Sequence, residues 1–160
     1  MSDDLDGFEG GCACRAVRYR LRSGPLIVHA CHCTECQRLG GGAFAVNALI
    51  ETDRLETLAG APRAVAVTGT SGKPQAIFRC PECATALWSH YPGAGPKLAF
   101  VRVGTLDDPA RFPPDIHIFT SAKLPWLELP NGARAVPEYY SASDVWPAAS
   151  LKRRRQSLGR

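Results

Sequence analysis

Cysteines are the residues of this chain best suited to chemistry. Seven of them occur among 160 residues, in three tight groups: Cys12-Ala-Cys14, Cys31-His-Cys33-Thr-Glu-Cys36 and Cys80-Pro-Glu-Cys83. Thiolates one or two residues apart can converge on a metal ion, and this spacing suits that role better than disulfide pairing. Because seven is odd, the cysteines divide naturally into a closed set of four and an open set of three. That division is expected between a structural and a catalytic zinc.

The outer two groups could form the closed set. In an extended backbone Cys12 and Cys14 project to the same side, and the tight reversal from Cys80 to Cys83 also brings two sulfurs together. Either pair alone is half of a tetrahedral site. Joined, the two pairs would hold a zinc ion about 2.3 Å from four thiolates, and this ion would contribute folding energy.

The central group supplies three thiolates, from Cys31, Cys33 and Cys36, and no fourth cysteine remains in the chain. A zinc ion with three protein ligands keeps one position for water or substrate. An all-thiolate site also accepts a further thiol well, and the metal deprotonates it. A substrate thiol is therefore a natural fourth ligand.

Other interpretations of the cysteines stay open. Disulfides would pair six and leave one free, a redox pair could form at Cys33/Cys36 or Cys80/Cys83, and the two metal sets could divide differently. His32 could close the central site, although in a locally extended segment it points away from the sulfur side. The simpler interpretation is that the His32 ring is hydrogen-bonded within the protein or faces solvent.

Two charged residues flank the central cysteines. Glu35 and Arg38 could position a carboxylated or carbonyl substrate, and ordinary surface charge explains them equally well. Glu35 is the nearest candidate for a general base, but the sequence assigns neither a base nor a substrate-binding residue.

The elements that must position these residues are short strands. Alternating or β-branched runs predict them, and glycines and prolines separate them. We expect strands at 16–22, 26–30, 43–50, 64–68, 75–79 and 98–103. Residues 37–42 offer at most one helical turn, and 106–111 could open a short helix with Pro109 near its start. The pattern predicts one mainly-β domain followed by a basic tail from about Pro147.

The charge of the chain resides in that tail. The net charge is +4, and the five basic residues after Asp144 leave the remainder at −1. Residues 147–160 are short and highly charged, so we expect them to be disordered. A basic run attracts phosphate in general, but a solvated terminus is the simpler interpretation, and we do not expect nucleic acid as a partner.

The composition favours a cytoplasmic protein. The acidic start of the chain lacks the features of an export signal. The longest apolar stretch, Ala43–Ile50, is far shorter than the roughly 20 residues needed to cross a bilayer. We therefore expect no membrane partner. In a reducing compartment the cysteines would be thiols or metal thiolates.

The cysteine motifs resemble a known family. Gly11-Cys-x-Cys14 with Val17-Arg-Tyr, Cys31-His-Cys-x-x-Cys36-x-Arg and Phe78-x-Cys-x-x-Cys83 are similar to the glutathione-dependent formaldehyde-activating enzyme family, also called the centromere protein V/GFA domain. The resemblance covers about residues 8–140 and implies an Mss4-like, mainly-β fold stapled by two zinc ions. One departure is Ala84, where the family commonly has glycine; a positive φ there would cost alanine more than glycine.

The resemblance also implies site roles and an activity. Structural zinc ligands would be Cys12, Cys14, Cys80 and Cys83; catalytic zinc ligands would be Cys31, Cys33 and Cys36. The family's activity condenses formaldehyde with glutathione to S-(hydroxymethyl)glutathione, formally a carbon–sulfur lyase reaction in reverse. We thus expect a small-molecule thiol such as glutathione and an aldehyde as partners. Two alternatives are the same chemistry on another thiol, and a non-catalytic zinc-binding module whose basic tail contacts nucleic acid or a protein.

Overall fold

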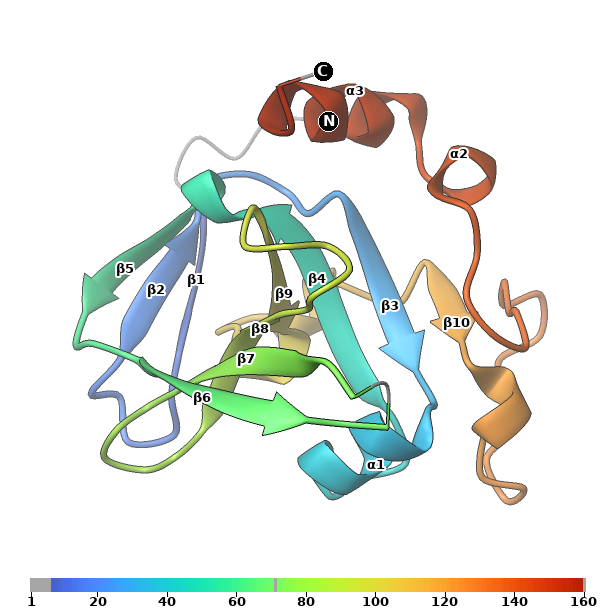
Figure 1. The fold of residues 1–160 in the computed structure, drawn as a ribbon, viewed down its shortest axis with the longest axis horizontal. Coiled ribbons are helices and arrows are strands. Elements are labelled where there is room, and N and C mark those ends of the chain that lie inside the picture. Colours follow the sequence, from blue (N-terminus) through green and yellow to red (C-terminus); the bar gives the residue numbers. More distant parts are fainter. Residues whose placement is uncertain (1–6, 71, 160) are drawn as a thin grey trace.

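Two β-sheets make up most of the protein (Figure 1). The computed structural model describes residues 7–70 and 72–159. Within them, one sheet has three strands and the other has seven, and the helices are few and short. The prediction of a mainly-β, single-domain fold is confirmed. No helix in this part of the chain is long and apolar enough to cross a membrane.

The small sheet has the order β1-β2-β5 and is antiparallel. Its strands are β1 (Phe8–Gly11), β2 (Arg18–Leu21) and β5 (Leu55–Ala59). The alternation expected for β2 is present: Tyr19 and Leu21 are fully buried, while Arg18 and Arg20 face the other way. Arg20 forms an ion pair with Glu9 of β1 at 2.6 Å. The period-2 pattern therefore assigns one face of this sheet to the core.

The large sheet has the order β10-β3-β4-β9-β8-β7-β6, and only the β10–β3 pair is parallel. Its strands are β3 (Ile27–Cys31), β4 (Ala45–Glu51), β6 (Arg63–Thr68), β7 (Pro74–Arg79), β8 (Ala86–His90), β9 (Leu98–Arg102) and β10 (Ile116–Ile118). The six strands expected from the sequence are all present, whereas β1, β5, β8 and β10 were not predicted.

Both faces of the large sheet are covered near its middle. Val28 and Ala48 belong to a core shared with the small sheet, while Ile27 and Leu49 belong to a second core that includes Trp146 from the C-terminal segment. All five residues of β3 are buried for this reason. The C-terminal segment is thus part of the structure that surrounds β3.

Three α-helices and four single turns of 3-10 helix accompany the sheets in the described residues. They are α1 (Thr34–Gly40), α2 (Ala142–Val145), α3 (Ala148–Ser157), η1 (Thr52–Arg54), η2 (Val103–Thr105), η3 (Pro109–Arg111) and η4 (Thr120–Ala122). α1 is longer than the single turn predicted, because Cys33 caps its start; the C-cap is Gly41, with φ of 66°. The short helix expected at 106–111 is η3.

The basic tail differs from its prediction. We expected disorder over 147–160, whereas Ala148–Ser157 forms α3. The Ser150 hydroxyl donates to the Leu26 carbonyl at 2.7 Å, and Arg153 pairs with buried Glu51. These long-range contacts offset the entropic cost of ordering a charged segment. Figure 1 shows α3 lying across the ends of the strands, at the opposite side of the molecule from α1.

Candidate metal centres and the adjoining cavity

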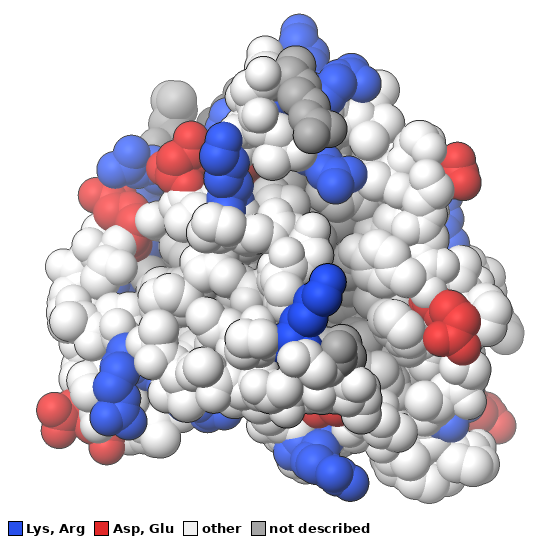
Figure 2. Space-filling model, viewed as in Figure 1, with Lys and Arg blue, Asp and Glu red and all other residues white. Residues whose placement is uncertain are grey.

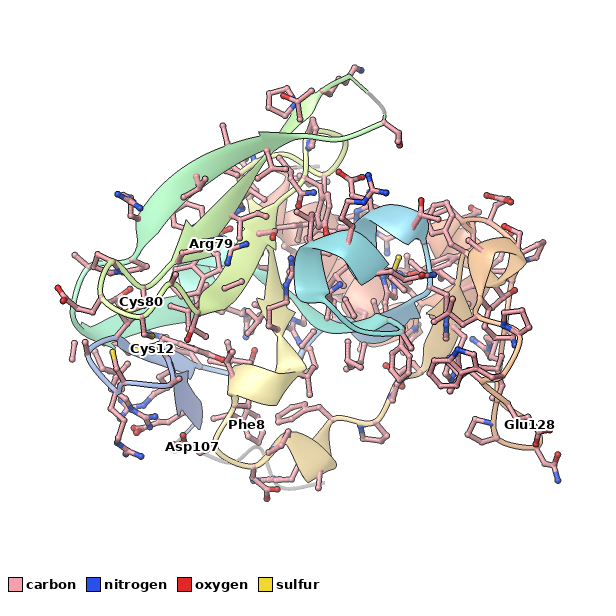
Figure 3. All side chains as sticks on the ribbon, turned by 90° about the horizontal axis from the view of Figure 1, so that it is seen from below. Phe8, Cys12, Arg79, Cys80, Asp107 and Glu128 are labelled. Carbon is pink, nitrogen blue, oxygen red and sulfur yellow. The ribbon has the colours of Figure 1, made fainter. Side chains whose placement is uncertain are left out.

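The four cysteines of the expected closed set meet in the structure. The sulfurs of Cys12, Cys14, Cys80 and Cys83 all lie within 4.8 Å of one another. The Sγ–Sγ separation is 3.5 Å for Cys12 and Cys14 and 3.7 Å for Cys14 and Cys80. Four sulfurs about 2.3 Å from a tetrahedral ion would lie about 3.8 Å apart, so this cluster fits zinc. Figure 3 shows Cys12 beside Cys80.

Two similar loops build this cluster. The Cys12 amide donates to the Val17 carbonyl at 3.1 Å, and the Cys80 amide donates to the Thr85 carbonyl at 3.0 Å. Each bond spans five residues and reverses the chain, which points both cysteines of the loop to one side. A cluster with this construction joins the start of the small sheet to the end of β7.

Each loop also contains a residue in the left-handed region. Arg15 follows the first pair with φ of 66°, and Ala84 follows the second with φ of 61°. Ala84 adopts this conformation within the loop, and its amide donates to the Cys80 carbonyl at 3.0 Å. The strain expected from having alanine at this position is therefore present.

Hydrogen-bond donors surround the sulfurs of the closed set. The Val17 amide donates to Cys12 Sγ at 3.2 Å. The pKa of the Cys83 thiol is lowered to about 5, because the hydroxyl and the amide of Thr85 donate to it. Donors of this kind favour the thiolate, the form that binds metal.

The central three cysteines form a second cluster. Cys31 ends β3, Cys33 is the N-cap of α1 and Cys36 lies in the first turn of α1. Their sulfurs lie within 4.8 Å of one another, and the Cys36 amide donates to Cys33 Sγ at 3.3 Å. The pKa of Cys33 is lowered because the thiols of Cys31 and Cys36 donate to it. A set of three soft thiolates fits zinc, and all three residues line a cavity.

His32 lies apart from the three sulfurs. Its Nε2 is 2.9 Å from Nδ1 of His117, and the two rings stack with centroids 5.2 Å apart. Burial lowers the pKa of both rings. Neither histidine belongs to the group of clustered ligand atoms within the described residues, so the structure agrees with the expectation that His32 points away.

A cavity of about 520 Å³ adjoins the three-cysteine cluster. Its floor is one face of the large sheet, formed by His29 and Cys31 of β3, Asn47 and Leu49 of β4, and Leu98 and Phe100 of β9. Its C-terminal wall consists of Tyr139, Tyr140, Ala142, Trp146 and Arg154. Glu35, Gln75 and Tyr91 also contribute. The cavity is thus largely aromatic and aliphatic, with few charged groups.

Hydrogen bonds link three residues of this cavity. Trp146 Nε1 donates to the Tyr140 hydroxyl at 2.7 Å, and the same hydroxyl bonds Nε2 of His29. Burial lowers the pKa of His29 to about 4 and raises that of Tyr140. His29 is therefore a neutral imidazole at neutral pH. Because His29 and Cys31 alternate along β3, they face the same side, about 7 Å apart along the strand.

Sequence reasoning overlooked these groups. The signal for His29 was its position two residues before Cys31 in a strand. Trp146 is buried in the second core and also lines the cavity. Of the two charged residues flanking the cysteines, Glu35 lines the cavity, and Gln75 Nε2 donates to its carboxylate at 3.4 Å. Arg38 is exposed and does not line it.

Several known proteins are similar to this chain. A protein of Halomonas elongata is 30% identical over 127 residues, covering 76% of this chain and 80% of that protein. A protein of Emericella nidulans is 29% identical over 93 residues, covering 55% of this chain and 46% of that protein. The names of both ascribe to them, provisionally, glutathione-dependent formaldehyde activation.

A crystal structure of a Rhodobacter sphaeroides protein is also similar. It shares 23% identity and has a TM-score of 0.47, covering 62% of this chain and 87% of that protein.

The family model extends the comparison over most of the chain. The model described as glutathione-dependent formaldehyde-activating enzyme matches residues 7–122. This range includes both cysteine clusters, whereas the wall formed by Tyr139, Tyr140, Trp146 and Arg154 lies beyond it. The chain belongs to the glutathione-dependent formaldehyde-activating enzyme family.

Proposed function

We propose that this protein is a zinc-dependent carbon–sulfur lyase that forms or cleaves S-(hydroxymethyl)glutathione or a related thiol–carbonyl adduct. The observation that carries this proposal is that three clustered thiols border a cavity large enough for a small-molecule substrate. Family membership supports a thiol and an aldehyde as the reacting pair. We further propose a cytoplasmic location, where a reducing environment keeps all seven thiols available for metal.

The two clusters would divide the metal roles. Structural zinc would be held by Cys12, Cys14, Cys80 and Cys83, and catalytic zinc by Cys31, Cys33 and Cys36. A zinc ion at a three-thiolate site supplies Lewis acidity and lowers the pKa of a bound thiol. The cavity residues would bind and orient the substrate beside it.

The reaction needs one proton transfer beyond the new bond. In the forming direction the thiol sulfur attacks the aldehyde carbon, the carbon–oxygen π pair moves to oxygen, and the thiol's proton ends on that oxygen. His29 and Tyr140 can move this proton, because they share a hydrogen bond and both line the cavity. Neutral His29 can accept it, and Tyr140 can relay it. Cleavage reverses these steps.

Paired cysteine substitutions test the division of roles. Cys33→Ser should lower the zinc content by one ion per chain and abolish exchange between formaldehyde, glutathione and their adduct, while the fold persists. Cys80→Ser should unfold the protein, because it opens the closed cluster. Zinc content, circular dichroism and NMR exchange spectroscopy give the three readouts. A wild-type protein that binds two zinc ions but causes no exchange with any thiol would instead be a non-catalytic zinc module.

Tyr140→Phe tests the proton relay separately. It removes the hydroxyl that bonds both His29 and Trp146, so kcat should fall about 100-fold or more, with KM changed far less. Zinc content should stay at the wild-type level. An unchanged kcat would remove Tyr140 from the mechanism while leaving the metal roles as proposed.

A further inference from the structure

Two residues of the cavity carry buried polar atoms that lack hydrogen-bond partners. They are Oε1 of Gln75 and Nε of Arg154; in residues 7–70 and 72–159 the only other such side-chain atom is Nδ1 of His32. The Gln75 amide is 4% exposed, and its orientation is fixed because Nε2 donates to the carboxylate of Glu35. Native proteins leave few buried polar atoms unpaired. Two around one cavity indicate a ligand that pairs with them.

Arg154 and the cysteines lie toward opposite ends of the cavity floor. Cys31 is the last residue of β3. α3 is anchored at the other end, where Ser150 bonds Leu26 just before β3 and Arg153 bonds Glu51 at the end of β4. Five residues of strand separate these levels by roughly 16 Å. The guanidinium carbon of Arg154 lies 5.3 Å from the centroid of the Trp146 ring.

The surface between the two ends is mostly apolar. Leu49, Leu98 and Phe100 form much of its floor, and the Phe100 ring meets Tyr91 edge to face at 4.6 Å. The polar residues of the floor, His29 and Asn47, already bond Tyr140 and Arg102. On the wall, Tyr139 and Tyr140 stack with ring centroids 4.8 Å apart. Such a surface favours an apolar or aromatic body. The two amide groups and the ammonium of glutathione would meet few polar partners there.

The charge at the far end is positive. Glu35 and Arg154 are the acidic and basic side chains that line the cavity. Glu35 accepts from Gln75, whereas no carboxylate of the described residues lies within ion-pair distance of Arg154. In Figure 2 lysine and arginine side chains gather over α3, and one further basic side chain stands in the middle of a face that is otherwise largely uncharged. A partly buried guanidinium is well suited to bind a carboxylate.

We infer that the substrate of this cavity has an apolar, aromatic-compatible body that ends in a carboxylate bound by Arg154. The identity of its other end, a thiol–carbonyl adduct at Cys31, Cys33 and Cys36, rests on the function proposed above. Gln75 Oε1 accepts a hydrogen bond from the hydroxyl of that adduct. The C-terminal segment thereby selects the apolar part and the carboxylate of the substrate, while the cysteines select its reacting group.

A thiol-free acid tests the inference without using the reaction. The probe is 3-phenylpropanoate, and its neutral match is 3-phenylpropanamide. Titrated into the full-length, zinc-loaded protein and followed by calorimetry, the acid should bind at least about tenfold more tightly than the amide. Arg154→Met should abolish this preference, and Arg154→Lys should retain part of it. Equal affinities for the two probes, or a preference that survives in Arg154→Met, would overturn the inference.

Arg155→Met is the matched control, because Arg155 is an exposed arginine of α3 that does not line the cavity. It should keep the wild-type preference, and its thermal unfolding should match that of Arg154→Met. Loss of the preference in both variants would assign it to the general charge of the helix and contradict the inference.

Two outcomes distinguish the carboxylate site at Arg154 from the lyase reaction. An Arg154-dependent preference for the acid, together with no adduct exchange for any thiol, would sustain the carboxylate site and remove the lyase reaction. Exchange with glutathione that is unaffected by Arg154→Met, together with no binding of 3-phenylpropanoate, would sustain the lyase reaction and remove the inferred substrate class.

Discussion

The guanidinium of Arg153 binds both carboxylate oxygens of Glu51: Nη2 donates to Oε2 at 2.6 Å and Nε donates to Oε1 at 2.9 Å. Glu51 is the last residue of β4 and is 2% exposed. A third donor of the same guanidinium bonds the Gly24 carbonyl at 2.9 Å. This pair fixes α3 against the large sheet, and the next residue along the helix, Arg154, lines the cavity.

Replacing Arg153 should therefore affect both stability and binding. In Arg153→Met the carboxylate of Glu51 stays buried, and the ion pair left to it among the described residues is the longer one with Arg54, at 3.7 Å. We expect the free energy of unfolding to fall by about 3 kcal/mol in urea titrations, and the preference for a carboxylate probe to weaken as α3 loosens. Arg155→Met, at an exposed position, should change stability by less than about 0.5 kcal/mol. Equal unfolding free energies for the two variants would contradict this account.

The ion pair between Arg153 and Glu51 should also determine how steeply the free energy of unfolding declines at acid pH. Burial is the largest single influence and would raise the pKa of Glu51. The hydrogen bond from Arg153, the backbone amide of Glu51 and the charges of Arg153 and Arg54 together outweigh burial, so the pKa is lowered. A lowered pKa in the folded state adds stability that is present above the unfolded value, about 4.3, and is lost as the pH falls through the folded value. Glu51→Gln should thus lose stability at neutral pH and show a flatter decline below about pH 4.

Glu56→Gln is the control for that experiment. The pKa of Glu56 is also lowered, by a hydrogen bond from Arg22, but this pair lies in solvent. Its contribution to stability should be small, so the unfolding free energy of this variant should decline at acid pH as that of the wild type does. Equal declines for the wild type and Glu51→Gln would show that the buried pair does not cause the loss of stability in acid.

Ala84→Gly should stabilise the protein. Ala84 has φ of 61°, where an L residue with a Cβ is strained by about 1–2 kcal/mol, and glycine would relieve the strain at the cost of more freedom in the unfolded chain. We expect a net gain of up to about 1 kcal/mol in the zinc-loaded protein. Ala64→Gly, at an exposed position in β6, should instead lose about 0.5–1 kcal/mol. A loss at both positions would refute the strain argument.

Chelation should remove zinc in two steps. An ion at the three-cysteine cluster has one thiolate fewer and borders a cavity through which a competing ligand can reach it. It should leave first, with the circular dichroism spectrum unchanged. The second ion should leave together with unfolding, because the four-cysteine cluster joins two distant parts of the chain. Release measured with a chromogenic chelator, alongside circular dichroism, would expose any loss of fold in the first step.

The cysteine clusters could be predicted from the sequence because their construction is local. In each of the three groups the cysteines lie within six consecutive residues, so a local turn or helix start brings their sulfurs together. Only the joining of Cys12 and Cys14 with Cys80 and Cys83 is long-range. Counting four and three cysteines suggested that joining. Alternating or β-branched runs bounded by turn residues similarly located most strands of the large sheet.

The cavity could not be predicted in this way. Its floor depends on the register that places Asn47 opposite His29 and Leu49 opposite Ile27, which no single strand reveals. Its wall depends on α3, whose sequence is strongly basic and therefore resembles a disordered tail. The sequence does not reveal that Glu51 pairs with Arg153 or that Leu26 pairs with Ser150. The helical conformation of α3 is therefore evident only from the packed structure.

The cysteine clusters and the C-terminal wall of the cavity come from separate parts of the chain. Both cysteine clusters come from residues 12–83, while Tyr139, Tyr140, Trp146 and Arg154 come from the last part of the chain. Exchanging residues 139–157 between relatives should therefore transplant a preference for the body of the substrate without disturbing either thiolate cluster. Tyr140, Ser150 and Arg153 would have to be exchanged together with that segment, because in the described residues they form its hydrogen bonds to β3, β4 and their flanks.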